Sequence, residues 1–218
     1  RIRYEGPAGR TDSDAAAAAD LAVGEVERTV RERLGPVVFG VEEQTLAGAA
    51  LELLKARNER LATVESCTGG LLGELITDVP GSSAVYAGGW VTYSNAFKTA
   101  EVGVPAAYFA TSGPGAVSRE TADAMARGGL DRSGAEWCLA ITGVAGPDGG
   151  TPEKPVGTVW VGLAWGGAGG VQPGSETRRF AFAGDRTSIR EWSARAALAM
   201  LRLRLVGASE TRLLRQAE

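Results

Sequence analysis

Histidine is absent from the 218 residues of this chain. Its absence excludes every catalytic scheme in which an imidazole activates a serine or a cysteine, and every zinc site that needs an imidazole ligand. A serine nucleophile here needs a lysine, a carboxylate, a tyrosine or the terminal amino group as its base. We expect no metal and no cofactor.

Lysine is scarce as well, because only Lys55, Lys98 and Lys154 occur among the 23 cationic side chains. The others are arginines, which do not give up a proton in proteins and so cannot serve as bases. A GC-rich genome also favours arginine over lysine, and for Lys55 we prefer that explanation. The other two lysines are candidates for a role that arginine cannot fill.

The chain lacks an apolar run of eighteen residues and a basic leader followed by an apolar segment. We therefore expect a cytoplasmic protein with no membrane partner. Its net charge of -3 argues against nucleic-acid binding by this domain. The two cysteines, Cys67 and Cys138, lie in apolar runs, which favours a reducing compartment over a disulfide framework.

Helical and strand-like segments alternate along the chain. Helical periodicity marks residues 23–34, 43–57, 71–79, 118–127 and 185–205, and apolar runs predict strands at 61–67, 88–94, 137–142, 158–165 and 176–182. This order predicts an α/β fold, a three-layer α/β/α sandwich around a mixed sheet of about five strands. We expect Ser118 and Asp185 to cap helices, and Ser188 with Glu191 has capping-box spacing.

The first 40 residues differ in composition from the rest, since residues 6–19 are polar, small and rich in alanine. We interpret residues 1–40 as the tail of a preceding domain or a linker, and residues 41–210 as one domain. The first residue is Arg rather than Met, so we expect the natural N-terminus to lie further upstream.

The most informative segment is the turn Glu65-Ser66-Cys67-Thr68-Gly69-Gly70, which joins an apolar strand to a helix. The first turn of a helix leaves backbone N–H groups without partners at the positive end of the helix dipole. Ser66 is therefore expected at the mouth of an anion site.

Three further segments are candidates for chemistry, and each also has a plain structural explanation. Residues 92–98 follow a strand and end in the scarce Lys98, although a solvated strand exit looks the same. Residues 141–150 run from a strand into a glycine-dense loop, which allows close approach to a ligand but equally suits a mobile loop. Arg186 follows the expected cap Asp185 and is a candidate phosphate clamp.

Five ordered motifs make the chain similar to the C-terminal domain of the competence/damage-inducible CinA family, which also occurs alone as nicotinamide-nucleotide amidase. They span roughly residues 40–205 and are Glu65-Ser66-Cys67-Thr68-Gly69-Gly70, Thr92-Tyr93-Ser94-Asn95 with Lys98, Gly115-Ala116-Val117-Ser118, Thr142-Gly143-Val144-Ala145-Gly146-Pro147-Asp148-Gly149-Gly150 and Lys154-Pro155-Val156-Gly157-Thr158-Val159. Residues 25–42 also resemble the segment that precedes this domain in two-domain members. We expect the chain to be a C-terminal piece of such a protein.

The resemblance implies hydrolysis of the carboxamide of nicotinamide mononucleotide, giving nicotinic acid mononucleotide and ammonia. In this hypothesis Ser66 attacks the amide carbon, neutral Lys98 takes the hydroxyl proton, and Tyr93 orients the amine or relays the proton. Backbone N–H groups from Cys67 to Gly69 receive the oxyanion. For this role the pKa of Lys98 must fall from about 10.4 to roughly 7 or 8, which burial or a nearby cation can produce.

The substrate is expected to contact the serine turn and the glycine-dense loop. Its phosphate is placed, in falling order of preference, against Arg186, the Ser82-Ser83 turn or residues 143–146. We also expect a homo-oligomer. The expected substrate-binding residues are Cys67, Thr68, Gly69, Gly70, Ser82, Ser83, Thr142, Gly143, Gly146 and Arg186.

Two alternatives stay open. A thiolate is a better nucleophile than a hydroxyl, but strand alternation is expected to point Cys67 away from Ser66 and into the core. The second alternative is a non-catalytic nucleotide- or partner-binding module, in which Ser66 is one more hydrogen-bond donor. The presence of both Ser66 and Lys98 favours the enzyme, since simple binding needs neither.

Overall fold

The structure is a computed structural model and describes residues 13–167 and 172–217. It divides into two compact units, Arg1–Thr45 and Leu46–Glu218. The first unit contains helix α1 (Ser13–Leu34) and the short 3-10 helix η1 (Gly35–Val37). The interpretation of residues 1–40 as the tail of a preceding domain stays a prediction.

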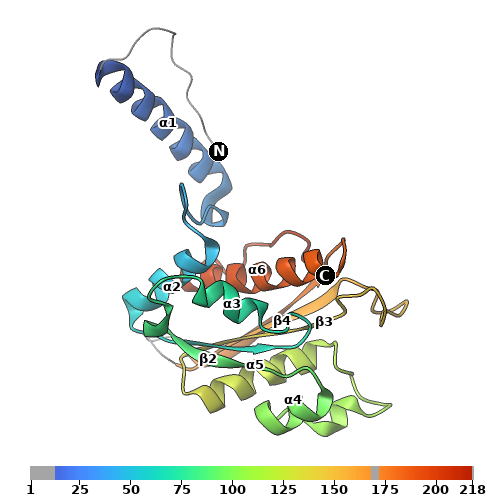
Figure 1. Cartoon of the computed structure of the whole chain (residues 1–218). Helices are drawn as coiled ribbons and strands as arrows, with labels where there is room; N and C mark the ends of the chain where they lie inside the picture. Colours follow the sequence, from blue (N-terminus) through green and yellow to red (C-terminus); the bar gives the residue numbers. More distant parts are fainter. Residues whose placement is uncertain (1–12, 168–171, 218) are drawn as a thin grey trace. The chain divides into compact units, whose positions relative to one another are not determined.

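The second unit contains one sheet with helices on both faces (Figure 1). No helix in the described ranges combines the length and the apolar character that crossing a membrane requires. The strands are β1 (Leu61–Glu65), β2 (Tyr86–Val91), β3 (Trp137–Gly143), β4 (Thr158–Trp165) and β5 (Gly174–Ala181). The helices are α2 (Leu46–Arg57), α3 (Leu71–Thr77), α4 (Asn95–Val102), α5 (Arg119–Ser133) and α6 (Arg186–Leu205), with 3-10 helices η2 (Ser82–Ala84) and η3 (Ala106–Phe109).

The sheet has the strand order β2-β1-β3-β4-β5 and mixes parallel with antiparallel pairs. Strand β1 runs parallel to both β2 and β3, whereas the β3–β4 and β4–β5 pairs are antiparallel. The predicted α/β fold with a mixed five-stranded sheet is therefore confirmed. Because parallel strands end at the same edge, the segments that follow β1, β2 and β3 meet there.

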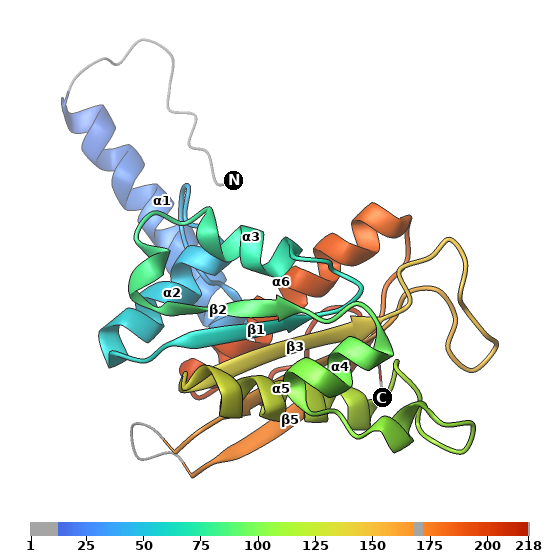
Figure 2. The ribbon, with the colours of Figure 1, turned by 60° about the horizontal axis from the view of Figure 1, so that its bottom comes forward.

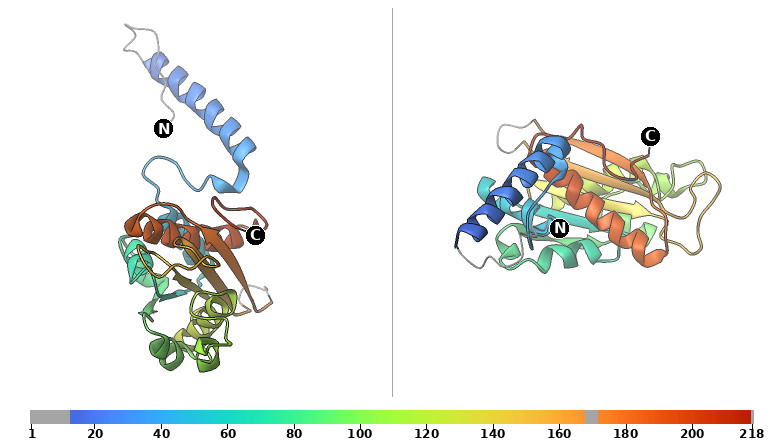
Figure 3. Two further views of the ribbon diagram at one scale, coloured as in Figure 1. Left: turned by 90° about the vertical axis from the view of Figure 1, so that its right-hand side faces the viewer. Right: turned by 90° about the horizontal axis from the view of Figure 1, so that it is seen from above.

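Helices α2, α3 and α6 cover one face of the sheet, and α4 and α5 cover the other (Figures 1, 2 and 3). Alternation along β1 divides its side chains between two cores. Leu61 packs with the first group of helices, and Ala62 and Val64 pack with the second. The next residues continue this alternation, which decides where Glu65, Ser66 and Cys67 point.

Helix α4 was not predicted from the sequence, which assigned residues 88–94 to a strand and the rest of that motif to its exit. The strand ends earlier, at Val91, and Ser94 begins the helix by accepting a hydrogen bond from the N–H of Phe97 at 3.1 Å. Eight residues are too few to show a clear helical period. The consequence is functional, because Lys98 lies in the first turns of this helix.

Helix α4 rests closely on α5 at a glycine. A Cβ placed on Gly128 would lie 1.7 Å from the backbone oxygen of Val102, the last residue of α4. A side chain at this position cannot fit without separating the two helices. The glycine therefore sets the distance at which α5 carries the helix that bears Lys98.

We expect Gly128→Ala to lower the free energy of unfolding by about 1–3 kcal/mol, as overpacked interiors do. Chemical denaturation monitored by circular dichroism measures this. The matched control is Arg127→Ala on the same helix, which removes only an exposed ion pair with Asp123, worth about 0.3–0.5 kcal/mol. Equal stability of the two variants contradicts the packing argument.

Candidate functional site

Ser66 directly follows β1 and remains tied to the sheet, since its N–H donates to the carbonyl oxygen of Ile141 at 3.0 Å. Alternation from Ala62 and Val64 directs its side chain to the face covered by α4 and α5. Only 9% of the residue is exposed. The hydroxyl therefore lies at the carboxyl edge of the sheet and largely out of water.

Lys98 reaches the same point from α4. Its amine nitrogen, Nζ, lies 3.0 Å from Ser66 Oγ and donates to the backbone oxygen of Thr92 at 2.8 Å. The residue is 1% exposed. The structure thus brings together the two side chains that the sequence singled out as nucleophile and base, at hydrogen-bonding distance.

Burial lowers the pKa of Lys98 below its ordinary value of 10.5, because the charged ammonium loses its hydration. A thiolate at Cys67 would oppose this shift, but burial raises the pKa of the Cys67 thiol to about 12. The thiol is therefore neutral near pH 7, and its opposing effect is absent there. The neutral amine is the form that can accept the hydroxyl proton of Ser66.

Cys67 is buried in the core beneath α3 and α6, on the face opposite to Ser66. The expected orientation of this thiol is confirmed. A neutral thiol inside an apolar core is a poor nucleophile, so the geometry favours the serine over its neighbour.

The serine turn is held by hydrogen bonds from within and from α6. The N–H of Gly69 donates to the carbonyl of Ser66 at 3.1 Å, and that of Leu71 donates to the carbonyl of Thr68 at 3.3 Å. Arg190 of α6 donates two hydrogen bonds to the same Thr68 carbonyl, from Nε at 3.2 Å and from Nη2 at 2.7 Å. The hydroxyl of Thr68 is buried and has no hydrogen-bond partner among the described residues.

Glu65 supplies the remaining support of this turn. Its carboxylate accepts from the N–H groups of Gly70 and Leu72, each at 3.0 Å, and from that of Gly73 at 2.8 Å. Gly70 is one of the expected substrate-binding residues, and its N–H is therefore already paired with a side chain of the protein.

Among the described residues, Tyr93 forms no hydrogen bond with the amine that it was expected to orient. Its hydroxyl accepts from Nη2 of Arg186 at 3.0 Å, and the side chain is 61% exposed. Nη1 of the same arginine donates to the carbonyl of Gly146 at 2.7 Å. Arg186 therefore bridges the segment before α4 and the glycine-dense loop, while the carbonyl of Thr92 orients the amine.

The expectation that Ser82 and Ser83 bind phosphate is wrong, because the two serines lie far from Ser66. They lie in η2, just before β2, and the neighbouring Val85 accepts from the N–H of Leu61 at the start of β1. The five residues of β1 separate this edge from Ser66 by roughly 17 Å at about 3.3 Å per residue. The sequence shows that this turn is next to a strand, but not that it lies at the opposite edge of the sheet from Ser66.

Thr142 and Lys154 brace the loops around the site rather than face an open space. The hydroxyl of Thr142, at the end of β3, donates to the carbonyl of Ala116 at 2.7 Å. Lys154 Nζ donates to the carbonyl of Pro114 at 2.8 Å. A Cβ on Gly143 would lie 2.7 Å from a methyl of Val159, so this glycine serves close packing against β4.

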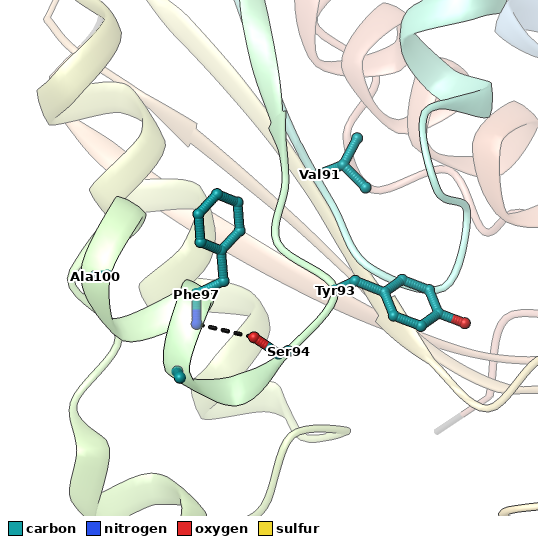
Figure 4. A pocket seen from close by; sticks show the side chains of 6 residues that line it. Val91, Tyr93, Ser94, Phe97 and Ala100 are labelled. Carbon is teal, nitrogen blue, oxygen red and sulfur yellow. Dashed lines mark hydrogen bonds between the residues drawn. The ribbon is translucent and has the colours of Figure 1, made fainter.

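An open hollow of about 420 Å³ lies beside the site, where β2 passes into α4 (Figure 4). Its labelled side chains include Val91, Phe97 and Tyr93, and the hydroxyl of Tyr93 points away from the ring of Phe97. Neither Ser66 nor Lys98 lines this hollow, whose walls are Val91, Tyr93, Ser94, Ala96, Phe97 and Ala100. It is thus separate from the contact between the amine and the hydroxyl.

Four supports of the site were not found from the sequence: the carboxylate of Glu65, the carbonyl of Thr92, Arg190 and Lys154. Glu65 and Lys154 stood inside recognised motifs but carried no assigned role. Arg190 contacts a carbonyl 122 positions away in the chain, and no local pattern reveals such a contact. Within the described ranges, no cluster of three or more Cys, Asp or Glu side chains is arranged to hold a metal ion.

Comparison with known proteins identifies the family to which the chain is similar. The family model of the CinA C-terminal domain matches residues 43–205. A CinA-like protein of Myxococcus xanthus is 46% identical over 195 residues, which are 88% of this chain and 44% of that protein. The nicotinamide-nucleotide amidohydrolase PncC of Pseudomonas putida is 52% identical over 154 residues, 71% of this chain and 91% of that protein.

Solved structures agree with this assignment. The crystal structure of competence/damage inducible protein CihA from Agrobacterium tumefaciens matches with a TM-score of 0.68 and 39% identity, covering 74% of this chain and 93% of that one. The chain spans less than half the length of the CinA-like relatives, as in the Myxococcus xanthus protein, but nearly all of the Pseudomonas putida one.

The lowered pKa of Lys98 predicts how stability depends on pH. Between the folded and the unfolded pKa the unfolded chain binds more protons, so the free energy of unfolding rises with pH. Below its folded pKa, the buried charged amine of Lys98 lowers the free energy of unfolding. Lys98→Met removes this cost of burying a charge. We expect the variant's advantage in the free energy of unfolding to be largest at acidic pH and to shrink as pH rises toward 10.5.

Denaturant titrations of both proteins from pH 6 to pH 10 measure this difference. Lys55→Met is the control, because it removes a lysine that lies exposed on α2. If the curves of Lys98→Met and the wild type run parallel over this range, the amine is not held below its ordinary pKa.

Proposed function

Because the chain belongs to the CinA C-terminal domain family, we propose that its residues 41–210 hydrolyse the carboxamide of nicotinamide mononucleotide to nicotinic acid mononucleotide and ammonia. The name of the Pseudomonas putida relative supports this substrate. The observation that carries the proposal is the 3.0 Å contact between Lys98 Nζ and Ser66 Oγ, with both groups buried.

In the first half of the proposed reaction, Ser66 Oγ attacks the carboxamide carbon while its proton passes to the lone pair of neutral Lys98. The carbonyl of Thr92 holds another hydrogen of the amine and so fixes the direction of the lone pair. When the tetrahedral intermediate collapses, Lys98 returns the proton to the departing nitrogen. Ammonia leaves, and an ester joins Ser66 to the substrate.

The developing oxyanion needs donors that the protein has not already used. Among the described residues, no oxygen accepts a hydrogen bond from the N–H groups of Cys67 and Thr68, whereas the N–H of Gly69 is engaged with Ser66. The residue after a serine nucleophile is a usual oxyanion donor. We therefore assign the oxyanion to the N–H groups of Cys67 and Thr68.

In the second half, water attacks the ester and gives its proton to Lys98. Collapse of the second intermediate restores the hydroxyl of Ser66 with that proton and releases the carboxylic acid of the product. One amine thus serves as base and acid in both halves, which requires a pKa near the working pH. Burial is the cause available in the structure.

Arg186 is the group we propose for the phosphate of the substrate. Two of its five N–H donors contact the protein, through Tyr93 and the carbonyl of Gly146. A guanidinium pairs with phosphate in a two-pronged geometry, so this arginine can exchange its contact with Tyr93 for the ligand. The glycine-dense loop would then close over the nucleotide from residues 143–146.

Several further parts of the proposal rest on the sequence or on the family. They are a cytoplasmic location, a homo-oligomeric state and the absence of membrane or nucleic-acid partners for this domain. The origin of residues 1–40 in a preceding segment of a longer protein is part of the same proposal. The non-catalytic module described above is the competing outcome of the experiment below.

Ammonia release from nicotinamide mononucleotide tests the proposal. We expect Ser66→Ala to lower kcat by about 10⁴-fold or more, and Lys98→Arg, which cannot lose its proton, by about 10²- to 10⁴-fold. Cys67→Ala should leave kcat within about threefold, because the thiol is buried and neutral. Tight binding of the nucleotide by a wild-type chain that releases no ammonia identifies the non-catalytic module.

The role of Arg186 has its own test. We expect Arg186→Met to raise KM for nicotinamide mononucleotide by about 10- to 100-fold, the loss expected for a charge-assisted hydrogen bond of about 1.5–3 kcal/mol. The same substitution should leave kcat/KM for nicotinamide riboside, which lacks the phosphate, almost unchanged. An equal loss for both substrates shows that Arg186 acts on the loop and not on the phosphate.

A further inference from the structure

Glu65 is a buried acid that the proposed reaction does not use. It is 2% exposed, and its two carboxylate oxygens receive three backbone N–H groups, those of Gly70, Leu72 and Gly73. No side chain caps α3 from its own N-cap position, which is Gly70 with φ of 100°. The carboxylate of Glu65, at the end of the preceding strand, caps α3 instead.

The glycine at position 73 leaves room beside the carboxylate for the hydroxyl of Tyr86. A Cβ on Gly73 would lie 3.1 Å from that hydroxyl, a tight contact, and 3.5 Å from Glu65 Oε1, an ordinary one. All three donors on Glu65 are N–H groups, which suits an ionised carboxylate with acceptors only. A neutral amide would set its NH₂ against one of these donors.

Occupation of these three N–H groups has a consequence for the serine turn. The start of α3 is closed to an anion from outside, because the protein's own carboxylate fills it. Arg190 of α6 also fixes this turn, through the carbonyl of Thr68. The N–H groups of Cys67 and Thr68 remain the donors of the turn for which no oxygen of the described residues competes.

We infer that Glu65 is a positioning residue: its carboxylate clamps the first turn of α3, and thereby fixes Ser66 and the N–H groups of Cys67 and Thr68 in the geometry that stabilises the oxyanion. This inference rests on the proposed function for its substrate. Glu65 and Ser66 are neighbours on opposite faces of the sheet, so a side chain on one face sets the backbone that carries the nucleophile on the other. Glu65 does not itself touch the reacting atoms.

The test compares Glu65→Gln with Glu59→Gln. Glu59 is another buried acid, 4% exposed, just before the start of β1, where it accepts a hydrogen bond from the indole N–H of Trp137 at 2.7 Å. Both variants remove a buried carboxylate, but in Glu59→Gln the amide oxygen can still accept the bond from Trp137, whereas an amide at position 65 has one acceptor too few for its donors. We expect Glu65→Gln to lower kcat about 10²-fold, the loss typical of a displaced oxyanion donor or nucleophile.

In Glu65→Gln the KM should stay within about threefold, since the turn acts on the transition state more than on the bound substrate. Glu59→Gln should keep both constants near those of the wild type. The inference is overturned if Glu65→Gln and Glu59→Gln have the same kcat, or if Glu65→Gln changes KM alone.

A second measurement separates this inference from the proposed substrate. A fluorophosphonate reacts with an activated serine when Oγ displaces fluoride from phosphorus, and it draws on the same oxyanion donors without any nucleotide. If the wild type is labelled but releases no ammonia, the proposed substrate fails, while slower labelling of Glu65→Gln than of Glu59→Gln still supports the positioning role. Equal labelling rates overturn it, and a wild type that is neither labelled nor active overturns both.

Discussion

A lysine amine lies almost wholly out of water, 3.0 Å from a serine hydroxyl, and this burial disfavours its charged form. The cost of burying an ammonium lowers the pKa of Lys98. The same burial raises the pKa of the thiol at Cys67, so no thiolate restores the charge. In the proposed mechanism, Lys98 is thus the proton acceptor for the serine of a chain without histidine, and burial rather than a neighbouring charge favours its neutral form.

The position of that amine depends on features far from the chemistry. Ser94 begins the short helix that carries Lys98, and Gly128 sets the distance at which the next helix supports it. On the other side of the contact, β1 delivers Glu65, Ser66 and Cys67 to alternating faces. The acid clamps the turn, the serine faces the amine, and the thiol fills the core. In the proposed mechanism, three consecutive residues at the end of one strand therefore support the turn, provide the nucleophile and pack in the core.

Much of this arrangement was predictable from the sequence, and the exceptions have physical causes. Strand β4 was predicted with the bounds that it has, because a continuous apolar run between turn residues is a strong local signal. Helix α4 was missed because it is short, and its lysine resembled a residue at a strand exit. The contacts of Arg190 and the placement of Ser82 at the far edge follow from tertiary topology, which local pattern does not encode. The resemblance to the family identified Ser66 and Lys98, and the fold explains why they meet.

The scarcity of lysine makes the central claim directly measurable. With 13C-labelled lysine, the chain gives Cε signals from only Lys55, Lys98 and Lys154, and single replacements by arginine assign them. The account predicts that the Lys98 signal titrates clearly below the ordinary value of 10.5 in the folded protein. A Lys98 signal that titrates at or above that value means that the amine is charged at working pH, which contradicts its role as the base for Ser66.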